Sequence, residues 1–200
     1  TVNGHLESFG YARGRLMQVF LYGVMTPELD ASELPGASRW GITPSDPMGT
    51  SVRRIETAPG KFRILTRSCA SLLPGMAASA RHLARAARIM QRKFDERFPK
   101  LAGLQMEHAW SGHLCLTLNS VSVCRELELG LVAACVQNGL GTTRGTLTGM
   151  AAAELTLGQN TPLSDHFSAE PAPKRLPPRP FREIGANAIL RLREWRVRAE

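Results

Sequence analysis

The pattern of apolar and polar positions is clearest in the second half of the chain. The apolar run from Leu131 to Val136 is typical of a buried strand. This run breaks at Gln137-Asn138-Gly139, which is a turn signal. A helix-compatible stretch from Thr142 to Leu157 follows, and Gly158 stands where a helix C-cap is expected. The pattern therefore predicts a strand, a glycine turn and a helix in direct succession.

The rest of the pattern predicts an α+β chain. We expect strands over residues 15–25, 51–55, 62–67 and 105–118, and helices over residues 77–98 and 181–199. The last of these helices is basic and amphipathic. We expect irregular segments over residues 36–49, 68–75 and 162–180, because glycine, proline and serine gather there.

The predicted turn has a chemistry of its own. A helix that starts directly after a glycine turn directs unpaired backbone N–H groups at one spot, where an anion or a partly negative oxygen can bind. Gly141, Gly145, Gly149 and Ala153 recur every four residues and would form one smooth stripe on the helix. Two interpretations stay open. Either another backbone packs closely on the stripe, or the turn and the first helical turn touch a cofactor.

The turn departs from the standard dinucleotide fingerprint. Gly139-Leu140-Gly141 supplies two glycines, but Arg144 stands where the third is expected. No acidic residue follows about twenty positions later to bind a ribose. If this turn meets a cofactor, another segment must therefore hold the adenine and the pyrophosphate.

Several motifs, in this order and spacing, carry a resemblance to a known family. Phe94–Leu101 is followed by Trp110-Ser111-Gly112, then by Thr117-Leu118-Asn119, then by Asn138–Gly141, and last by Ala152–Leu155. Together they resemble the C-terminal half of the D-amino-acid oxidase family of FAD-dependent oxidoreductases. Members of this family transfer a hydride from the carbon beside an amine nitrogen to the flavin.

The resemblance implies both a fold and a cofactor site. Residues 1–109 would form part of a substrate-side domain, an antiparallel sheet with a helix. Residues 110–200 would return to the FAD-binding α/β domain as its C-terminal strand–turn–helix portion. FAD is the implied cofactor, although the family's N-terminal glycine fingerprint is absent here. The cofactor-binding residues implied by the resemblance are Gly112, Asn138, Gly139, Leu140, Gly141, Thr142 and Thr143.

The substrate side is less complete. The family often places a carboxylate-binding arginine where this chain has Leu114, so an amine, or an amino acid held by Arg144, is the expected substrate. His113 follows Gly112 and is the second candidate for substrate contact. No residue stands out as a catalytic base. A metal is not expected, because His108 and His113 would point to opposite faces of one strand.

The composition of the chain indicates its net charge and the redox state of its cellular compartment. The formal net charge is +8, and we expect solvated basic helix faces without a nucleic-acid or membrane partner, since no aromatic interleaving accompanies the charge. Four cysteines without paired spacing suggest reduced thiols and a cytoplasmic protein. Cys115 also suggests a covalent flavin link, although buried cysteines usually act as small apolar residues.

The chain begins at Thr1 and carries no pyrophosphate-binding fingerprint. We therefore expect a fragment whose partner is the missing N-terminal FAD-binding half, and expect it to be inactive by itself. The alternative function is a non-catalytic basic α+β interaction module without a cofactor.

Overall fold

A computed structural model describes residues 3–46 and 48–198. Pro47, in the stretch 36–49 that we expected to be irregular, lies outside the described residues. The chain divides into two compact units, each made of separate stretches of sequence. The first unit contains the residues up to Val19, Pro74–Met76 and His113–Ile184, and the second contains Phe20–Leu73, Ala77–Gly112 and the residues from Gly185 onward.

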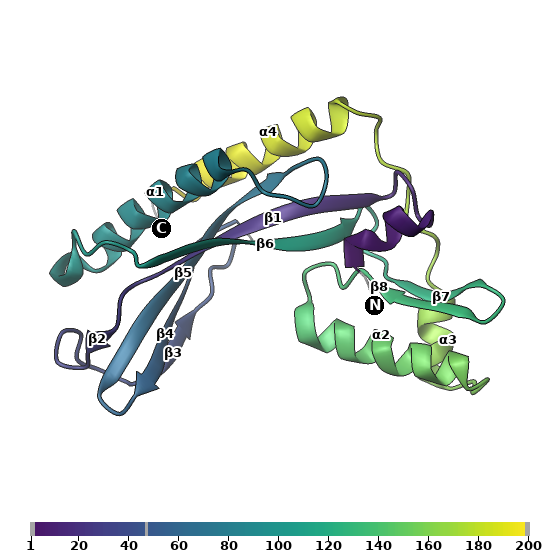
Figure 1. The fold of residues 1–200 in the computed structure, drawn as a ribbon, viewed down its shortest axis with the longest axis horizontal. Coiled ribbons are helices and arrows are strands. Elements are labelled where there is room, and N and C mark those ends of the chain that lie inside the picture. The colour runs from purple at the N-terminus through teal and green to yellow at the C-terminus, as the bar shows by residue number, and fades with distance from the viewer. Residues whose placement is uncertain (1–2, 47, 199–200) are drawn as a thin grey trace. The chain divides into compact units, whose positions relative to one another are not determined.

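An antiparallel sheet dominates the second unit (Figure 1). The strand order is β3-β4-β5-β1-β6, with β2 paired to β5. The strands are β1 (Leu16–Met25), β2 (Leu29–Asp30), β3 (Trp40–Ile42), β4 (Ser51–Ala58), β5 (Lys61–Leu72) and β6 (His108–Thr117). The first residues of β1, up to Val19, and the last residues of β6, from His113, belong to the first unit. The expected strands over residues 51–55 and 62–67 are confirmed as β4 and β5, which pair with Val52 opposite Thr66 and Arg54 opposite Ile64. The short strand β3 lies inside the stretch 36–49, which we expected to be a loop.

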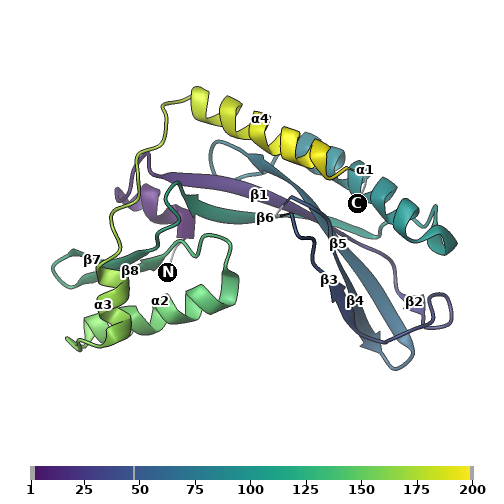
Figure 2. The same cartoon turned by 180° about the vertical axis from the view of Figure 1, so that it is seen from behind.

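Two long helices lie side by side along one face of this sheet in both views (Figures 1 and 2). They are α1 (Ala80–Arg97) and α4 (Phe181–Arg196), and the single turn η2 (Pro99–Leu101) follows α1. α1 starts where Ser79 accepts a hydrogen bond from the backbone of His82, three residues later than expected. Its buried Met90 and Phe94 pack on the sheet side chains, which fixes α1 as the core helix of this unit.

β5 runs further than the sequence predicts. Residues 68–72 were expected to be irregular, but β5 continues to Leu72, although its pairing with β4 stops at Arg67, opposite Ser51. Side chains of α4 replace the missing strand. The amide of Asn187 bonds both the N–H and the C=O of Leu72, and Glu194 accepts the N–H of Ala70. On the edge of β5 that β4 leaves uncovered, the backbone polar groups of Ala70 and Leu72 are thus satisfied by a helix.

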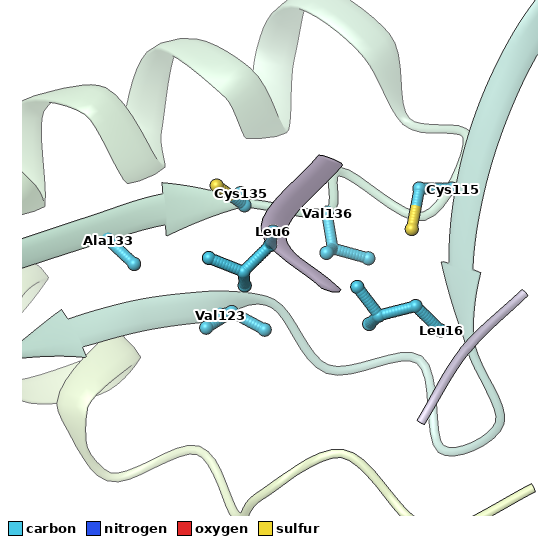
Figure 3. Close-up of a cluster of buried hydrophobic side chains, with 7 residues drawn as sticks. All are labelled: Leu6, Leu16, Cys115, Val123, Ala133, Cys135 and Val136. Atoms are coloured by element: carbon cyan, nitrogen blue, oxygen red, sulfur yellow. The ribbon is translucent and has the colours of Figure 1, made fainter. Parts of the chain in front are cut away.

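The first unit is a hairpin covered by helices. Its elements are η1 (Asn3–Phe9), β7 (Val123–Glu128), β8 (Leu131–Cys135), α2 (Gly141–Thr156) and α3 (Pro162–Ser168). β7 and β8 pair in antiparallel register, with Val123 opposite Cys135. One cluster of buried side chains comes from η1, the hairpin and the strands β1 and β6 (Figure 3): Leu6, Leu16, Cys115, Val123, Ala133, Cys135 and Val136. A second, of Cys124, Ala151 and Phe167, joins β7 to α2 and α3.

The α+β class and the strand–turn–helix succession are therefore confirmed. The expectation of a purely irregular segment over residues 162–180 is wrong for its first part, which forms α3. Thr161 caps this helix by accepting hydrogen bonds from Leu163 and Ser164, and Pro162 occupies the first helical turn. A capping box with proline at this position is a helix start signal, and it outweighs the proline content of the segment.

Candidate functional site

The connection from β8 to α2 is built from left-handed backbone positions. Val136, Asn138, Gly139 and Gly141 have φ values of +66°, +51°, +80° and +52°. Glycine adopts this conformation without steric cost, and asparagine tolerates it better than other residues. The backbone N–H of Leu140 closes the turn by bonding the carbonyl of Gln137. The chain thereby reverses direction within a few residues and enters α2 at Gly141.

Asn138 fixes this turn to the end of β6. Its Oδ1 accepts the backbone N–H of Thr117 at 2.8 Å, and its Nδ2 donates to the carbonyls of Val121 and Val136. The Thr117 hydroxyl donates to the Val121 carbonyl as well. Asn138 was expected to contact a cofactor, but these bonds give its side chain a positioning role, and any ligand contact is left to its backbone.

The N-terminus of α2 is open. Among the described residues, no side chain caps the helix at Leu140 and no acidic residue lies in its first turn. Gly139, Leu140, Gly141, Thr142 and Thr143 are all exposed. Free N–H groups at a helix start carry a partial positive charge and favour an electron-rich ligand atom.

Glycine at position 141 leaves room beside this helix start. A Cβ added there would meet no described atom within 4 Å, and one at Gly139 would meet only the Leu114 side chain, at 3.9 Å. The backbone of the turn is therefore accessible to a ligand.

The close-packing interpretation of the glycine stripe is wrong within the described chain. A Cβ at Gly145 would meet only the Gln137 side chain, at 3.4 Å, and a Cβ at Gly149 would meet nothing within 4 Å. Gly141 is equally open. None of the three glycines has a described backbone packed against it, so packing inside this chain does not explain their helix-propensity cost of about 1 kcal/mol each.

Arg144 is held by its own chain. Its Nε donates to the Ser122 hydroxyl at 2.6 Å, its Nη1 to the Ser120 carbonyl at 3.0 Å, and its Nη2 to Glu170 Oε1 at 2.5 Å. Glu170 also accepts the backbone N–H of Ser122. Arg144 thus ties α2 to the segment before β7 and to the segment after α3. A substrate carboxylate at Arg144 would have to share the guanidinium with Glu170.

His113 is partly buried in the first unit. Its Nε2 lies 2.5 Å from Oε1 of Gln18 on β1. Burial lowers the pKa of His113, and the neighbouring His5 lowers it further. The imidazole is therefore neutral at pH 7, and it can offer a substrate hydrogen bonds but no positive charge. Gln18, Ser122 and Glu170 carry no motif that would have identified them as partners of these residues.

Gly112 lies in the second unit, on β6, and is exposed with no described atom within 4 Å of an added Cβ. Trp110, two residues earlier, covers Gly23 of β1, where an added Cβ would lie 2.8 Å from the indole Cζ2. The tryptophan of the Trp-x-Gly motif therefore packs on a neighbouring strand, and its glycine stays accessible.

The cysteines have a structural role. All four are free and buried. Burial raises the pKa of Cys115 to about 12, with smaller contributions from Glu7 and Cys135, so its thiol is not ionised at neutral pH. A thiol in this state is a poor nucleophile for covalent flavin attachment. Within residues 3–46 and 48–198, no group of three histidine, cysteine or acidic side chains is placed to hold a metal ion.

Comparison with known proteins places the fold. No protein-family model matches the chain. Over 74 residues, 37% of this chain, it is 32% identical to the probable oxidoreductase OrdL of Rhizobium meliloti (strain 1021). Glycine oxidase from Geobacillus kaustophilus has a similar structure over 78% of this chain, with a TM-score of 0.55 and 18% identity. Iminodiacetate oxidase (IdaA) from Chelativorans sp. BNC1 matches over 84%, with a TM-score of 0.51 and 16% identity.

A third solved structure, L-amino acid deaminase from Proteus myxofaciens in complex with anthranilate, matches 78% of this chain with a TM-score of 0.52 and 16% identity. The chain spans 17% of the curated relative's length, 39% of the glycine oxidase and 44% of each of the other two structures. The likeness to the solved structures therefore concerns the fold of part of those enzymes.

Proposed function

We propose that this chain, which shares its fold with part of the D-amino-acid oxidase family, belongs to an FAD-dependent oxidoreductase that oxidises the C–N bond of an amine or an amino acid. The observation that carries the proposal is the open N-terminus of α2 after the left-handed turn at Asn138, Gly139 and Gly141. The similar folds of an oxidase of glycine and an oxidase of iminodiacetate support the substrate class.

The residues of the turn fit the electron-rich edge of a flavin ring. The exposed backbone of Gly139, Leu140, Gly141, Thr142 and Thr143 offers donors and leaves room for a planar group. A helix N-terminus stabilises a nearby negative charge by about 0.3–1 kcal/mol at an exposed site, and by more in a drier one. Asn138 would act as a positioning residue through Thr117. Gly112 stays a predicted further contact on the strength of the resemblance.

FAD, when bound, supplies the acceptor for the hydride that leaves the carbon beside the amine nitrogen. This chain would contribute binding contacts and electrostatic stabilisation to the reaction. Hydrolysis of the resulting imine by water needs no residue of this chain as a nucleophile. His113, kept neutral by burial, would orient the substrate through hydrogen bonds. Arg144 would reach an amino-acid carboxylate only alongside Glu170, so its role as a substrate ligand stays a prediction.

The architecture of the complete enzyme follows from the same resemblance. Residues 1–109 would contribute to the substrate side and residues 110–200 to the flavin domain, and a separate segment would bind the adenine and pyrophosphate. We therefore expect residues 1–200 by themselves to bind FAD weakly and to be inactive. The buried free thiols support a reducing, cytoplasmic setting.

An absorption spectrum of the complete purified protein tests this proposal. We expect flavin absorption bands, release of FAD on denaturation, and bleaching of the bands when glycine, iminodiacetate or a simple secondary amine is added without oxygen. A protein that is folded but colourless, and that stays colourless when refolded with FAD, would favour the non-catalytic interaction module instead.

A further inference from the structure

The helix α4 presents its polar side to the protein and its apolar side outward. Asn187, Arg191 and Glu194 lie three or four residues apart and therefore share one helix face. Asn187 bonds the backbone of Leu72, and Glu194 pairs with Arg85 of α1 at 2.7 Å. Arg191 donates to the Ser71 hydroxyl and the Ala70 carbonyl. These contacts fix the orientation of the helix on the second unit.

The opposite side of α4 carries its apolar residues. Ile189, Leu192 and Trp195 are 55%, 48% and 58% exposed, and the same pattern continues back along the helix to Ile184 and Phe181. Among its described residues, α4 has no buried position. An amphipathic helix normally buries its apolar stripe, whereas the large apolar side chains of α4 are exposed. We call Ala188, Ile189, Leu192 and Trp195 the outer face of α4.

The charges around this face are positive. Arg193 and Arg196 are exposed on α4, and Arg198 stacks on the Trp195 ring at 4.3 Å. The two carboxylates of α4 are used internally: Glu183 pairs with Arg179 and Arg182, and Glu194 pairs with Arg85 and Arg191. The outer face therefore combines large apolar side chains with arginines whose charge no carboxylate of α4 balances.

This combination fits one class of partner better than the others. A second copy of the chain, docked through the same face, would bring like charges together. An anionic lipid surface complements both features, because the apolar side chains enter the acyl boundary while the arginines meet lipid phosphates. Tryptophan also favours the membrane–water interface.

We propose that α4 docks on an anionic lipid bilayer, lying flat in the interface with its outer face toward the lipid. The helix does not cross the bilayer, and no helix of the described chain is long and apolar enough to do so. The proposal departs from the expectation of a solvated basic helix without a membrane partner. That expectation rested on the lack of aromatic residues interleaved with the charge, whereas the structure leaves Trp195 and the other large apolar side chains of α4 exposed and bonds its polar side chains to the chain.

Vesicle co-sedimentation of the complete purified protein tests the proposal independently of flavin content. The probes are phosphatidylcholine vesicles and vesicles of phosphatidylcholine with one third phosphatidylglycerol. We expect binding to the second kind only, weakened by added salt. The double variant Ile189→Ser and Leu192→Ser should reduce the binding constant about tenfold or more without lowering the melting temperature, since both side chains are exposed. Reversing Arg193 and Arg196 to glutamate should have a similar effect.

The matched control is Leu129→Ser, because Leu129 is fully exposed in the β7–β8 turn and is not part of α4. This variant should bind vesicles like the unaltered protein. Three results would overturn the proposal: no binding to anionic vesicles, equal binding by the α4 variants, or an equal loss in the Leu129 variant. A second copy of the chain is the competing occupant of the outer face, and light scattering without vesicles tests for it. A dimer that dissociates when Ile189 and Leu192 are changed to serine would assign the outer face to a second copy.

Discussion

The side-chain oxygen of Asn138 accepts the backbone N–H of Thr117 at 2.8 Å, and this bond ties the turn before α2 to the last residue of β6. The turn belongs to a segment 21 residues further along the chain. The position of the α2 N-terminus is therefore set by a side chain that need not touch a ligand itself.

Removing this side chain should loosen the turn. Asn138→Gly keeps the left-handed backbone accessible but loses the bonds to Thr117 and Val121. We expect a loss of about 1–3 kcal/mol in the free energy of unfolding, measured by urea denaturation, because buried polar groups lose their partners. Ser120→Gly is the control, since Ser120 has a similar φ of +56° and is exposed. An equal loss in both variants would argue against the anchoring role.

Gly141 tests the ligand contact itself. Gly141→Val should weaken FAD binding at least tenfold, because a branched side chain would fill the space beside the helix start. Valine is also strained at a φ of +52° and costs about 1–2 kcal/mol of stability there. Gly158→Val provides the matched control, because Gly158 has a φ of +67° and equal space at the other end of α2. FAD titration should separate the two variants although both melt earlier.

A charge in the first turn of α2 should act in opposite directions on stability and on binding. Thr142→Asp places a negative charge at the helix N-terminus, which stabilises the helix by about 0.3–1 kcal/mol. The same charge would repel the electron-rich edge of a bound flavin and weaken FAD binding about five- to tenfold. Thr142→Asn is the neutral control. Calorimetry measures the change in stability, and FAD titration measures the change in affinity. An unchanged affinity for FAD in the aspartate variant would argue against a flavin contact at this helix start.

The buried thiol of Cys115 predicts a loss of stability at high pH. Its pKa is raised from 9.0 to about 12 in the folded chain, mainly by burial, so between these values the unfolded chain releases a proton that the folded chain keeps. The free energy of unfolding should therefore fall as the pH rises above 9. Cys115→Ala, compared at pH 8 and pH 10.5 by urea denaturation, should show a smaller fall than the unaltered chain. An identical fall in both would assign the alkaline loss to other groups.

The sequence allowed prediction of those parts of the fold whose signals are local. The turn at Gln137-Asn138-Gly139, the hairpin of β4 and β5 and the helix α1 each depend on residues within one short window, and all three are confirmed. The resemblance to the D-amino-acid oxidase family also holds for the fold.

Partners distant in sequence escaped prediction. Glu170 lies 26 residues from Arg144 and meets it only because α3 packs beside α2. A guanidinium that looks available for a substrate in the sequence is therefore already paired in the structure. The direction of the outer face of α4 depends in the same way on Asn187, whose partner Leu72 is 115 residues away.

The contacts of α4 with the end of β5 also affect the behaviour of the chain in solution. A strand that runs past its neighbour offers unpaired backbone groups to strands of other molecules, which leads to aggregation. Asn187 and Glu194 occupy these groups at Leu72 and Ala70 with side chains that cannot extend a sheet. In the folded chain, α4 thereby covers backbone groups of β5 that a strand of another molecule could otherwise bond.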